Sequence, residues 1–174
     1  MPDTFIIFTP KIVLREVQMI DDEHILSAMN CPEVHSMHSN GFNNISDVRR
    51  YIPVLLQEYQ NGNYRTLAIA DKDTNELCGT ITIDKHKFIP RAELGYWISL
   101  PHRNKGYASE AVRAVIGYCF SRLDVKRVQA VHRIDNPASG RVLEKAGMTY
   151  EGTLRLYNGV ADEKMYSAII NDIK

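Results

Sequence analysis

The sequence predicts a mixed α/β domain with a central, mostly antiparallel β-sheet flanked by helices. Segments that alternate between apolar and polar residues, which is typical of strands, are interspersed with segments whose apolar residues recur every three or four positions, which is typical of helices. These segments follow the order strand, two helices, three strands, helix, strand, helix, two strands. A mixed sheet with mostly antiparallel neighbours accounts for this order.

The length and organisation of the chain predict a single domain over residues 1–174. A domain of this length buries about two-thirds of its unfolded surface. The sequence contains no internal repeat, no low-complexity tract and no linker rich in Pro or Gly. No composition boundary therefore divides it.

Charge and cysteine content exclude several classes of protein. The 21 basic residues equal the 21 acidic ones, so the chain lacks the excess positive charge that nucleic-acid and membrane binding use, and we expect neither partner. The three cysteines, Cys31, Cys78 and Cys119, are far apart, which argues against a disulfide framework. The apolar stretch Phe5–Phe8 is too short for a signal peptide or a membrane span. A cytoplasmic location is expected.

The first half of the chain predicts one strand, two helices and two further strands. They are expected at Lys11–Val17, Asp21–Asn30, Ser46–Gly62, Tyr64–Ala70 and Leu77–Asp84. Ser46 is the expected N-cap of the second helix, which contains Pro53 and closes at Asn61-Gly62. Between the helices, residues 31–44 lack periodicity and form a long loop, a kind of segment that is often functional.

The second half predicts strand, helix, strand, helix and two final strands. The first strand is expected at Ala92–Ser99, and the helix after it buries an apolar face made of Ala108, Ala111, Val112, Val115, Ile116, Cys119 and Phe120. A strand at Arg127–Ile134 follows. Asn136 and Pro137 then begin a helix that ends at Ala146 and is closed by Gly147. The last two strands lie in Met148–Ile170, around an Asn158-Gly159 turn.

The loop between the strand at Ala92–Ser99 and the next helix is suited to binding an anion. A helix N-terminus presents unpaired N–H groups and favours negative charge. Gly106 allows close backbone approach, and Arg103 and Lys105 add positive charge. These features predict a phosphate or pyrophosphate site. The alternative is a basic, solvent-exposed helix start that binds no ligand.

This loop resembles a known family. Arg103-Asn104-Lys105-Gly106-Tyr107-Ala108 matches the Arg/Gln-x-x-Gly-x-Gly/Ala motif of the Gcn5-related N-acetyltransferases (GNATs). Asn136-Pro137-Ala138-Ser139, followed by residues 142–148, resembles the second family signature, and the order of elements is also that of the family. Leu14-Arg15, Gly95–Ile98 and Asn158-Gly159 with Asp162 and Tyr166 are similar to the ribosomal-protein N-terminal acetyltransferase branch.

The resemblance implies an acetyltransferase that uses acetyl-CoA and in which an amine attacks the thioester directly, without an acyl-enzyme. It implies a backbone N–H between Trp97 and Ser99 as the oxyanion donor. The coenzyme-binding residues that it implies are Ile98, Ser99, Leu100, Arg103, Asn104, Lys105, Gly106, Tyr107, Ala108, Ser109, Asn136 and Ser139. The partners are then acetyl-CoA and a primary amine. That amine is a protein or peptide N-terminus, as the ribosomal-protein branch implies, or a small molecule.

Glu93 is the first candidate for the general base, because similar acids on this strand serve that role in relatives. The alternative is a surface Glu that pairs with Arg91 or another cation, and His132 is the second candidate base. Many relatives carry a tyrosine as general acid where this chain has Leu143, which cannot donate a proton. Ser139 is the nearest substitute, although a Ser in a first helical turn often only bonds backbone or coenzyme.

No metal is expected, since His35 and His38 form the only close histidine pair and no acid completes a ligand set. The competing function is a non-catalytic acyl-CoA sensor, which Leu143 favours and Glu93 and Ser139 disfavour. The oligomeric state is left open between monomer and homodimer.

Overall fold

The computed structural model describes residues 6–31, 42–60 and 64–172. Its strands are β1 (Ile6–Phe8), β2 (Ile12–Glu16), β3 (Tyr64–Asp71), β4 (Leu77–Lys85), β5 (Arg91–Ile98), β6 (Arg127–Arg133), β7 (Thr149–Leu154) and β8 (Glu163–Ile169). Its helices are α1 (Asp22–Met29), α3 (Ile45–Gln60), α4 (Tyr107–Arg122) and α5 (Pro137–Ala146), with short 3₁₀ turns η1 (Met19–Asp21), η2 (Leu100–His102) and η3 (Ile170–Asp172).

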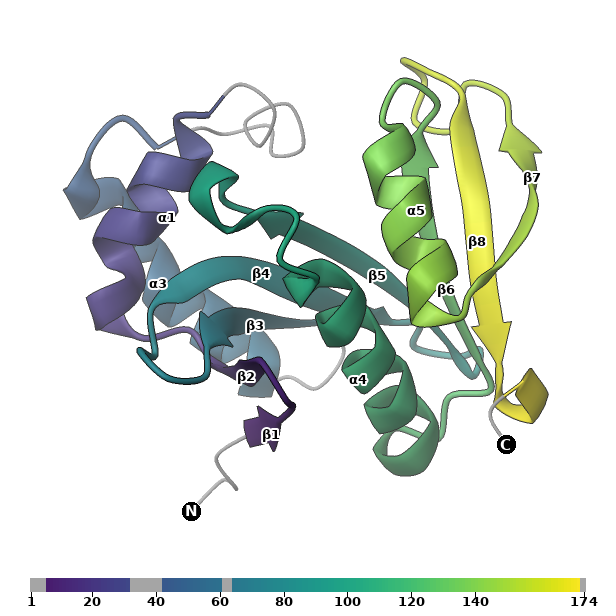
Figure 1. Cartoon of the computed structure of the whole chain (residues 1–174), viewed down its shortest axis with the longest axis horizontal. Helices are drawn as coiled ribbons and strands as arrows, with labels where there is room; N and C mark the ends of the chain where they lie inside the picture. The colour runs from purple at the N-terminus through teal and green to yellow at the C-terminus, as the bar shows by residue number, and fades with distance from the viewer. Residues whose placement is uncertain (1–5, 32–41, 61–63, 173–174) are drawn as a thin grey trace. The chain divides into compact units, whose positions relative to one another are not determined.

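The strands of the described residues form one eight-stranded sheet in the order β1-β2-β3-β4-β5-β6-β8-β7 (Figure 1). β1 with β2, β2 with β3, β6 with β8 and β7 with β8 pair antiparallel, whereas β5 pairs with β6 in parallel. The predicted fold class, a mixed and mostly antiparallel sheet with helices, is confirmed. None of the described helices is both long enough and apolar enough to cross a bilayer.

The chain divides into two compact units. The first comprises Met1–Thr82 and Tyr96–Tyr107, and the second comprises Ile83–Gly95 and Ala108–Lys174. The boundary passes through β4, β5 and the start of α4 rather than through a linker. A single domain over residues 1–174 therefore stays a prediction.

The core of the first unit lies where α1 packs on α3 and α3 packs on β3 (Figure 1). Its buried members are Val17, Ile25, Ala28, Met29, Val48, Ile52, Leu55, Ala68, Leu77 and Trp97. Trp97 is 5% exposed and belongs to this core. A Cβ on Gly79 would lie 2.1 Å from the carbonyl oxygen of Trp97, so β4 approaches the end of β5 at a distance that only glycine allows.

Two details of the first unit correct the sequence prediction. β1 was not expected, since a three-residue strand carries almost no periodicity and is defined by its pairing with β2. The N-cap of α3 is Asn44 rather than Ser46, because the Asn44 Oδ1 accepts the N–H of Asp47 at 3.1 Å. The predicted long loop falls largely on residues 32–41, and the predicted stop at Asn61-Gly62 falls on residues 61–63. Both ranges lie outside the described residues.

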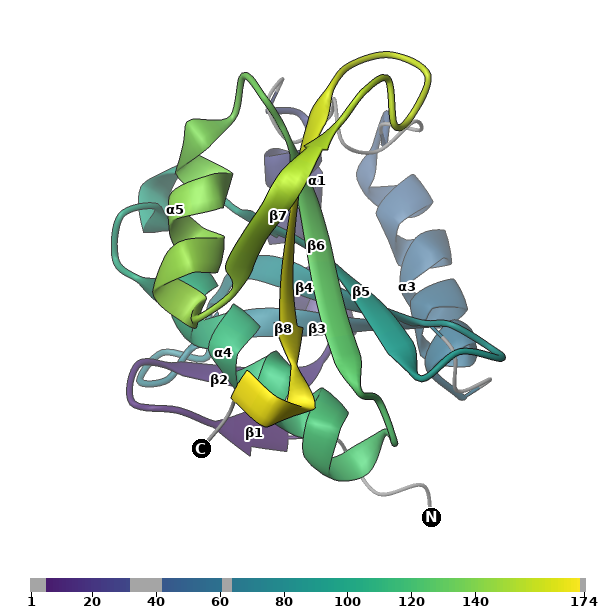
Figure 2. The ribbon, with the colours of Figure 1, turned by 90° about the vertical axis from the view of Figure 1, so that its right-hand side faces the viewer.

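In the second unit, α5 packs against β6, β7 and β8 (Figure 2). Its predicted ends are confirmed: the Asn136 side chain accepts the N–H of Ser139, Pro137 begins the helix, and Gly147 closes it with φ 96°. The predicted apolar face of α4 is also buried at Ala111, Val112, Val115, Ile116 and Cys119.

The connection between β7 and β8 is longer than the predicted two-residue turn. It spans residues 155–162, and Asn158-Gly159 lies inside it. The Asn158 Oδ1 accepts the N–H groups of Val160 and Ala161, so this asparagine organises a broad loop.

Candidate active site

The loop predicted to bind an anion runs from the end of β5 through η2 to the first residue of α4. Two of its residues adopt left-handed backbone conformations, Asn104 with φ 63° and Gly106 with φ 87°. Asn and Gly are the residues that accept such angles at low cost. Residues Ile98–Tyr107, all in the first unit, are called the cofactor loop below.

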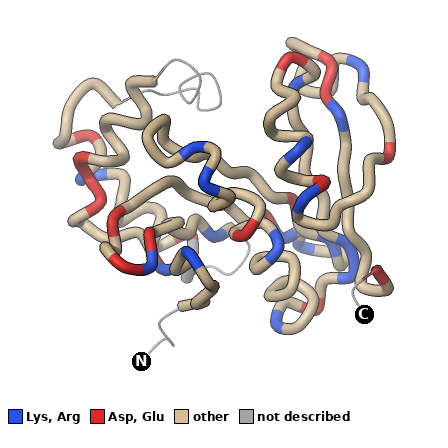
Figure 3. Tube along the Cα trace, in the orientation of Figure 1, with Lys and Arg blue, Asp and Glu red and all other residues tan. Residues whose placement is uncertain are grey.

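The cofactor loop contains the basic residues Arg103 and Lys105, and Figure 3 colours the basic residues blue along the Cα trace. The Nε of Arg103 donates to the carbonyl oxygen of Ile98 at 3.1 Å, so this guanidinium folds back along the loop. The Nζ of Lys11, from outside the loop, donates to the carbonyl oxygen of Lys105 at 3.1 Å. The same Nζ lies 3.6 Å from where a Cβ on Gly106 would stand. Sequence reasoning did not select Lys11, because it is distant along the chain from the motif.

The N–H and hydroxyl of Ser99 already make hydrogen bonds within the protein, which reduces the number of candidate oxyanion donors. Its N–H donates to the carbonyl oxygen of Cys78 at 2.9 Å, and its hydroxyl donates to the same oxygen at 3.0 Å. The Nδ1 of His102 lies 2.8 Å from the Ser99 Oγ. The expectation of an oxyanion donor between Trp97 and Ser99 is therefore wrong for Ser99, whose N–H is already used, and is retained for the two residues before it.

The remaining positions predicted to bind the coenzyme at or after the loop differ in exposure. Leu100 is exposed, Ile98 is buried, and Ala108 and Ser109 are half-buried in the first turn of α4. Tyr107 is buried, and its hydroxyl donates to the Oδ2 of Asp71 at 2.6 Å. This hydrogen bond, together with burial, raises the pKa of Tyr107 to about 12, and the same hydrogen bond lowers the pKa of Asp71. The side chain of Tyr107 therefore serves as a structural anchor.

Glu93, in the second unit, lies where the parallel pairing of β5 and β6 ends. That pairing runs from Arg91–Arg127 to Glu93–Gln129. The Gln129 Nε2 donates to the Glu93 Oε2 at 2.7 Å, so the half-buried carboxylate is oriented by an amide rather than by Arg91. Gln129 is only 4% exposed. A buried amide in the apolar run 128–131 was the sequence signal that could have identified it.

A second carboxylate, Glu163, lies on the same face of this sheet as Glu93. Glu93 is opposite Gln129 on β6, and Glu163 is opposite Arg133 on β6. Gln129 and Arg133 are four residues apart on one strand and therefore share a face, so Glu93 and Glu163 share that face too. The side chain of Glu163 is buried, and the Asn158 Nδ2 donates to its Oε1 at 2.8 Å. Burial raises the pKa of Glu163, and the negative charge of Glu93 adds to the shift.

The Glu93 carboxylate also raises the pKa of Tyr157, with burial adding to the effect. The Glu93 carboxylate therefore influences the pKa values of both Glu163 and Tyr157. Of these three residues, sequence reasoning identified only Glu93 as a site residue.

His132 lies on the opposite face, under α5. Its Nε2 is 2.7 Å from where a Cβ on Gly140 would stand, its Nδ1 lies 2.8 Å from the carbonyl oxygen of Arg133, and the side chain is 6% exposed. Because successive side chains of a strand point to opposite faces, Gln129 and His132 lie on different sides of β6. His132 and Glu93 therefore lie on opposite faces of this sheet, and the identity of the base stays a prediction.

Ser139 is half-buried in the first turn of α5, and its N–H donates to the Oδ1 of Asn136 at 3.3 Å. Since α5 covers the His132 face, Glu93 and Ser139 lie on opposite sides of the second unit's sheet. Leu143 is fully buried on α5. The structure thus groups Glu93 with Glu163, and Asn136 with Ser139.

Within residues 6–31, 42–60 and 64–172, no group of three or more His, Cys, Asp or Glu side chains is arranged to hold a metal ion. His35 and His38 lie outside this part of the chain. That the reaction needs no metal stays a prediction.

Comparison with known proteins decides the family. The model of the acetyltransferase (GNAT) domain matches residues 11–149. The chain belongs to the GNAT acetyltransferase family. It is 35% identical to the uncharacterized N-acetyltransferase YoaA of Bacillus subtilis, over 94% of this chain and 96% of the relative. It is also 28% identical to the ribosomal-protein-serine acetyltransferase of Escherichia coli, over 72% of each chain.

Among solved structures, the microcin C7 self-immunity acetyltransferase MccE, in complex with acetyl-CoA and AMP, is similar to this GNAT chain with a TM-score of 0.79 and 26% identity. The match covers 93% of this chain and 94% of that one. The predicted family and enzyme class, an N-acetyltransferase, are confirmed, as is the predicted likeness to ribosomal-protein acetyltransferases. The prediction of acetyl-CoA as co-substrate agrees with the complex of that immunity enzyme.

Proposed function

We propose that this protein transfers an acetyl group from acetyl-CoA to the N-terminal amine of a protein or peptide. The observation that carries the proposal is the oriented Glu93 carboxylate with the buried Glu163 on the same face of the sheet. Two carboxylates on one face attract a cationic amine and can remove its proton, as amine attack on a thioester requires. The ribosomal-protein-serine acetyltransferase among the relatives supports a protein acceptor over a small amine.

In the proposed mechanism, the cofactor loop holds the coenzyme pyrophosphate. Its left-handed backbone at Asn104 and Gly106 and the charges of Arg103 and Lys105 suit an anion. Asn136 and Ser139 are proposed as further coenzyme ligands. A variant such as Gly106→Glu places a carboxylate at the phosphates and should abolish acetyl-CoA binding. Normal binding by a folded Gly106→Glu protein would contradict the assignment of the loop.

Glu93 is proposed as the general base. Gln129 holds its Oε2, and we assign its Oε1 to accept the amine proton, directly or through a water molecule. Glu163 supports this role by adding negative charge that stabilises the incoming ammonium. Ser139 is proposed to protonate the departing thiolate, because Leu143 cannot.

The test is a thiol-release assay with acetyl-CoA against short peptides that differ in their first residue, with N-terminally blocked versions of the same peptides as matched controls, and with a panel of small amines. We expect release with free peptides only. Release with small amines alone would assign a small-molecule acceptor.

The competing function, a non-catalytic acyl-CoA sensor, rests on Leu143, a buried side chain that cannot donate a proton, at the position where the family resemblance implies a tyrosine. It predicts calorimetric binding of acetyl-CoA without thiol release for any acceptor. The variant Glu93→Gln also distinguishes the acetyltransferase from the non-catalytic sensor. In an enzyme this variant should bind acetyl-CoA normally and lose about 10²–10⁴ in turnover. The defect should be greatest at low pH, where the amine is protonated.

A further inference from the structure

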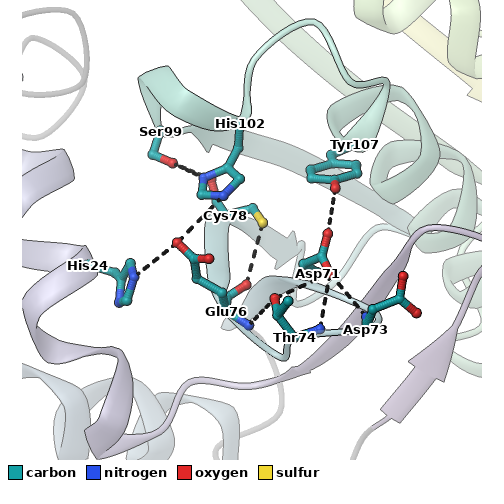
Figure 4. A network of polar contacts seen from close by, with 9 residues as sticks. All are labelled: His24, Asp71, Asp73, Thr74, Glu76, Cys78, Ser99, His102 and Tyr107. Carbon is teal, nitrogen blue, oxygen red and sulfur yellow. Dashed lines mark hydrogen bonds and ion pairs between the residues drawn. The ribbon is translucent and has the colours of Figure 1, made fainter.

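The turn between β3 and β4, residues 71–76, contacts the cofactor loop in its middle and at its end (Figure 4). At the end of the loop, the Asp71 Oδ2 accepts the hydroxyl of Tyr107 at 2.6 Å. In the middle, the Glu76 Oε1 lies 3.6 Å from the His102 Nε2. The turn and the loop both belong to the first unit.

Of these two contacts, the one made by Asp71 has the carboxylate whose orientation is fixed by more hydrogen bonds. Its other oxygen, Oδ1, accepts the N–H of Asp73 at 3.0 Å and the N–H and hydroxyl of Thr74 at 3.1 and 3.3 Å. These bonds fix the orientation of the carboxylate and direct Oδ2 to Tyr107 (Figure 4). Tyr107 is 8% exposed, so its hydroxyl lies in a site where a lost hydrogen bond is not replaced freely by water.

The turn is itself anchored from β2. The Nε of Arg15 donates to the Asn75 Oδ1 at 2.9 Å, and the Nη2 donates to the Asn75 carbonyl oxygen at 3.2 Å. Arg15 is buried and makes a two-bond ion pair with Asp21, both bonds measuring 2.8 Å. The turn therefore offers Tyr107 a fixed partner.

Tyr107 directly follows Gly106 and begins α4, so its anchor determines where the left-handed part of the cofactor loop ends. We propose that Asp71 is a positioning residue for coenzyme binding. Through the Tyr107 hydroxyl it holds the backbone N–H groups of residues 104–107 in the orientation that binds the pyrophosphate. The inference rests on the proposed function, because it takes the ligand of this loop to be acetyl-CoA.

The sign of the expected effect makes the proposal testable. Asp71 is negatively charged, and so is the pyrophosphate. Charge alone therefore predicts that Asp71→Asn binds acetyl-CoA more tightly. Positioning predicts the opposite, because the amide is a weaker and differently disposed partner for the Tyr107 hydroxyl.

The experiment is calorimetric titration of acetyl-CoA into the wild type, Asp71→Asn, Tyr107→Phe, the double variant and Asp73→Asn. Asp73→Asn is a matched control, because it removes one negative charge from the same turn. The contact between residue 73 and Asp71 is made by the backbone N–H of residue 73, so the substitution leaves it in place. We expect Asp71→Asn and Tyr107→Phe each to raise Kd about tenfold, the value of one charge-assisted hydrogen bond. The double variant should bind no more weakly than either single one, and Asp73→Asn should leave Kd unchanged or lower it.

Turnover distinguishes positioning from general damage. With S-acetylpantetheine, which lacks the pyrophosphate, kcat/KM of Asp71→Asn should equal that of the wild type, and kcat at saturating acetyl-CoA should change less than about twofold. A variant whose fold was damaged would show a lower kcat/KM with S-acetylpantetheine and also a lower kcat with saturating acetyl-CoA.

The outcomes distinguish a failure of the proposed function from a failure of this inference alone. If the wild type does not bind acetyl-CoA, the proposed function and this inference both fail. If the wild type binds and Asp71→Asn binds equally or more tightly, only the inference fails. If Asp71→Asn does not fold, Tyr107→Phe carries the test, since it keeps the buried ring, and wild-type affinity in that variant overturns the inference.

Discussion

The same substitution, Gly→Ala, is expected to have opposite effects in the two long helices of the second unit. In α4, a Cβ on Gly117 would have no neighbour within 4 Å. In α5, a Cβ on Gly140 would lie 2.7 Å from the His132 Nε2 and 3.3 Å from the Tyr166 hydroxyl. We therefore predict that Gly117→Ala stabilises the protein and Gly140→Ala destabilises it.

Two opposing contributions set the change in the free energy of unfolding: the helix preference of alanine over glycine, and overpacking against neighbouring side chains. Alanine in place of glycine within a helix contributes about 1 kcal/mol, because the unfolded chain loses conformational freedom. At Gly117 this gain is complete. At Gly140 it is offset by overpacking, which costs about 1–3 kcal/mol. His132 cannot withdraw easily, because it is buried, its Nδ1 lies 2.8 Å from a backbone carbonyl, and its ring centroid is 5.6 Å from that of Tyr166.

Differential scanning calorimetry measures the difference between the two variants. At about 2–4 °C per kcal/mol for a chain of this size, the difference of about 1–3 kcal/mol should make Gly140→Ala melt about 2–12 °C below Gly117→Ala. In a His132→Ala background the shortest contact is removed and only the 3.3 Å approach to the Tyr166 hydroxyl remains, so Gly140→Ala should cost less stability there than in the wild type. Equal melting temperatures for the two single variants in the wild-type background would refute the packing argument.

Three further predictions concern charged groups. Lys11→Met should raise the Kd for acetyl-CoA by about three- to tenfold at low salt and less at high salt, and a salt-independent loss would exclude an electrostatic role. Glu151, whose pKa is lowered to about 2 chiefly by Arg127, should contribute stability above its ordinary pKa of 4.5 and lose that contribution as the pH falls toward 2. Since its side chain is 39% exposed, the contribution is about 1 kcal/mol, and denaturant unfolding of Glu151→Gln should converge with the wild type in acid rather than remain offset. Arg15→Met should cost about 3–5 kcal/mol because it leaves Asp21 buried and unpaired, and a loss below about 1 kcal/mol in urea unfolding would contradict that reading.

Local features of this chain were predictable because the residues that cause them are neighbours in the sequence. Asn136, Pro137 and Gly147 define both ends of α5 through bonds and angles within a few residues of each. The apolar face of α4 follows from a spacing of three and four. The cofactor loop was identified by its glycine, its basic residues and its resemblance to the family motif.

Where the prediction failed, the cause lay in partners outside the local segment. β1 exists because β2 pairs with it, and its three residues carry no pattern of their own. The Ser99 N–H was considered for the oxyanion, but the carbonyl oxygen of Cys78 uses it.

The sequence by itself therefore determined the order of the elements after β1, the ends of α5, the family and the loop expected to hold the coenzyme, since periodicity, capping and motif spacing are local properties. Only the tertiary structure decided which side chains meet. Strand register brings Gln129 to Glu93, and the β3–β4 turn brings Asp71 to Tyr107, across 36 positions of chain in each case. Such encounters depend on how strands align and turns close, and no short stretch of sequence encodes them.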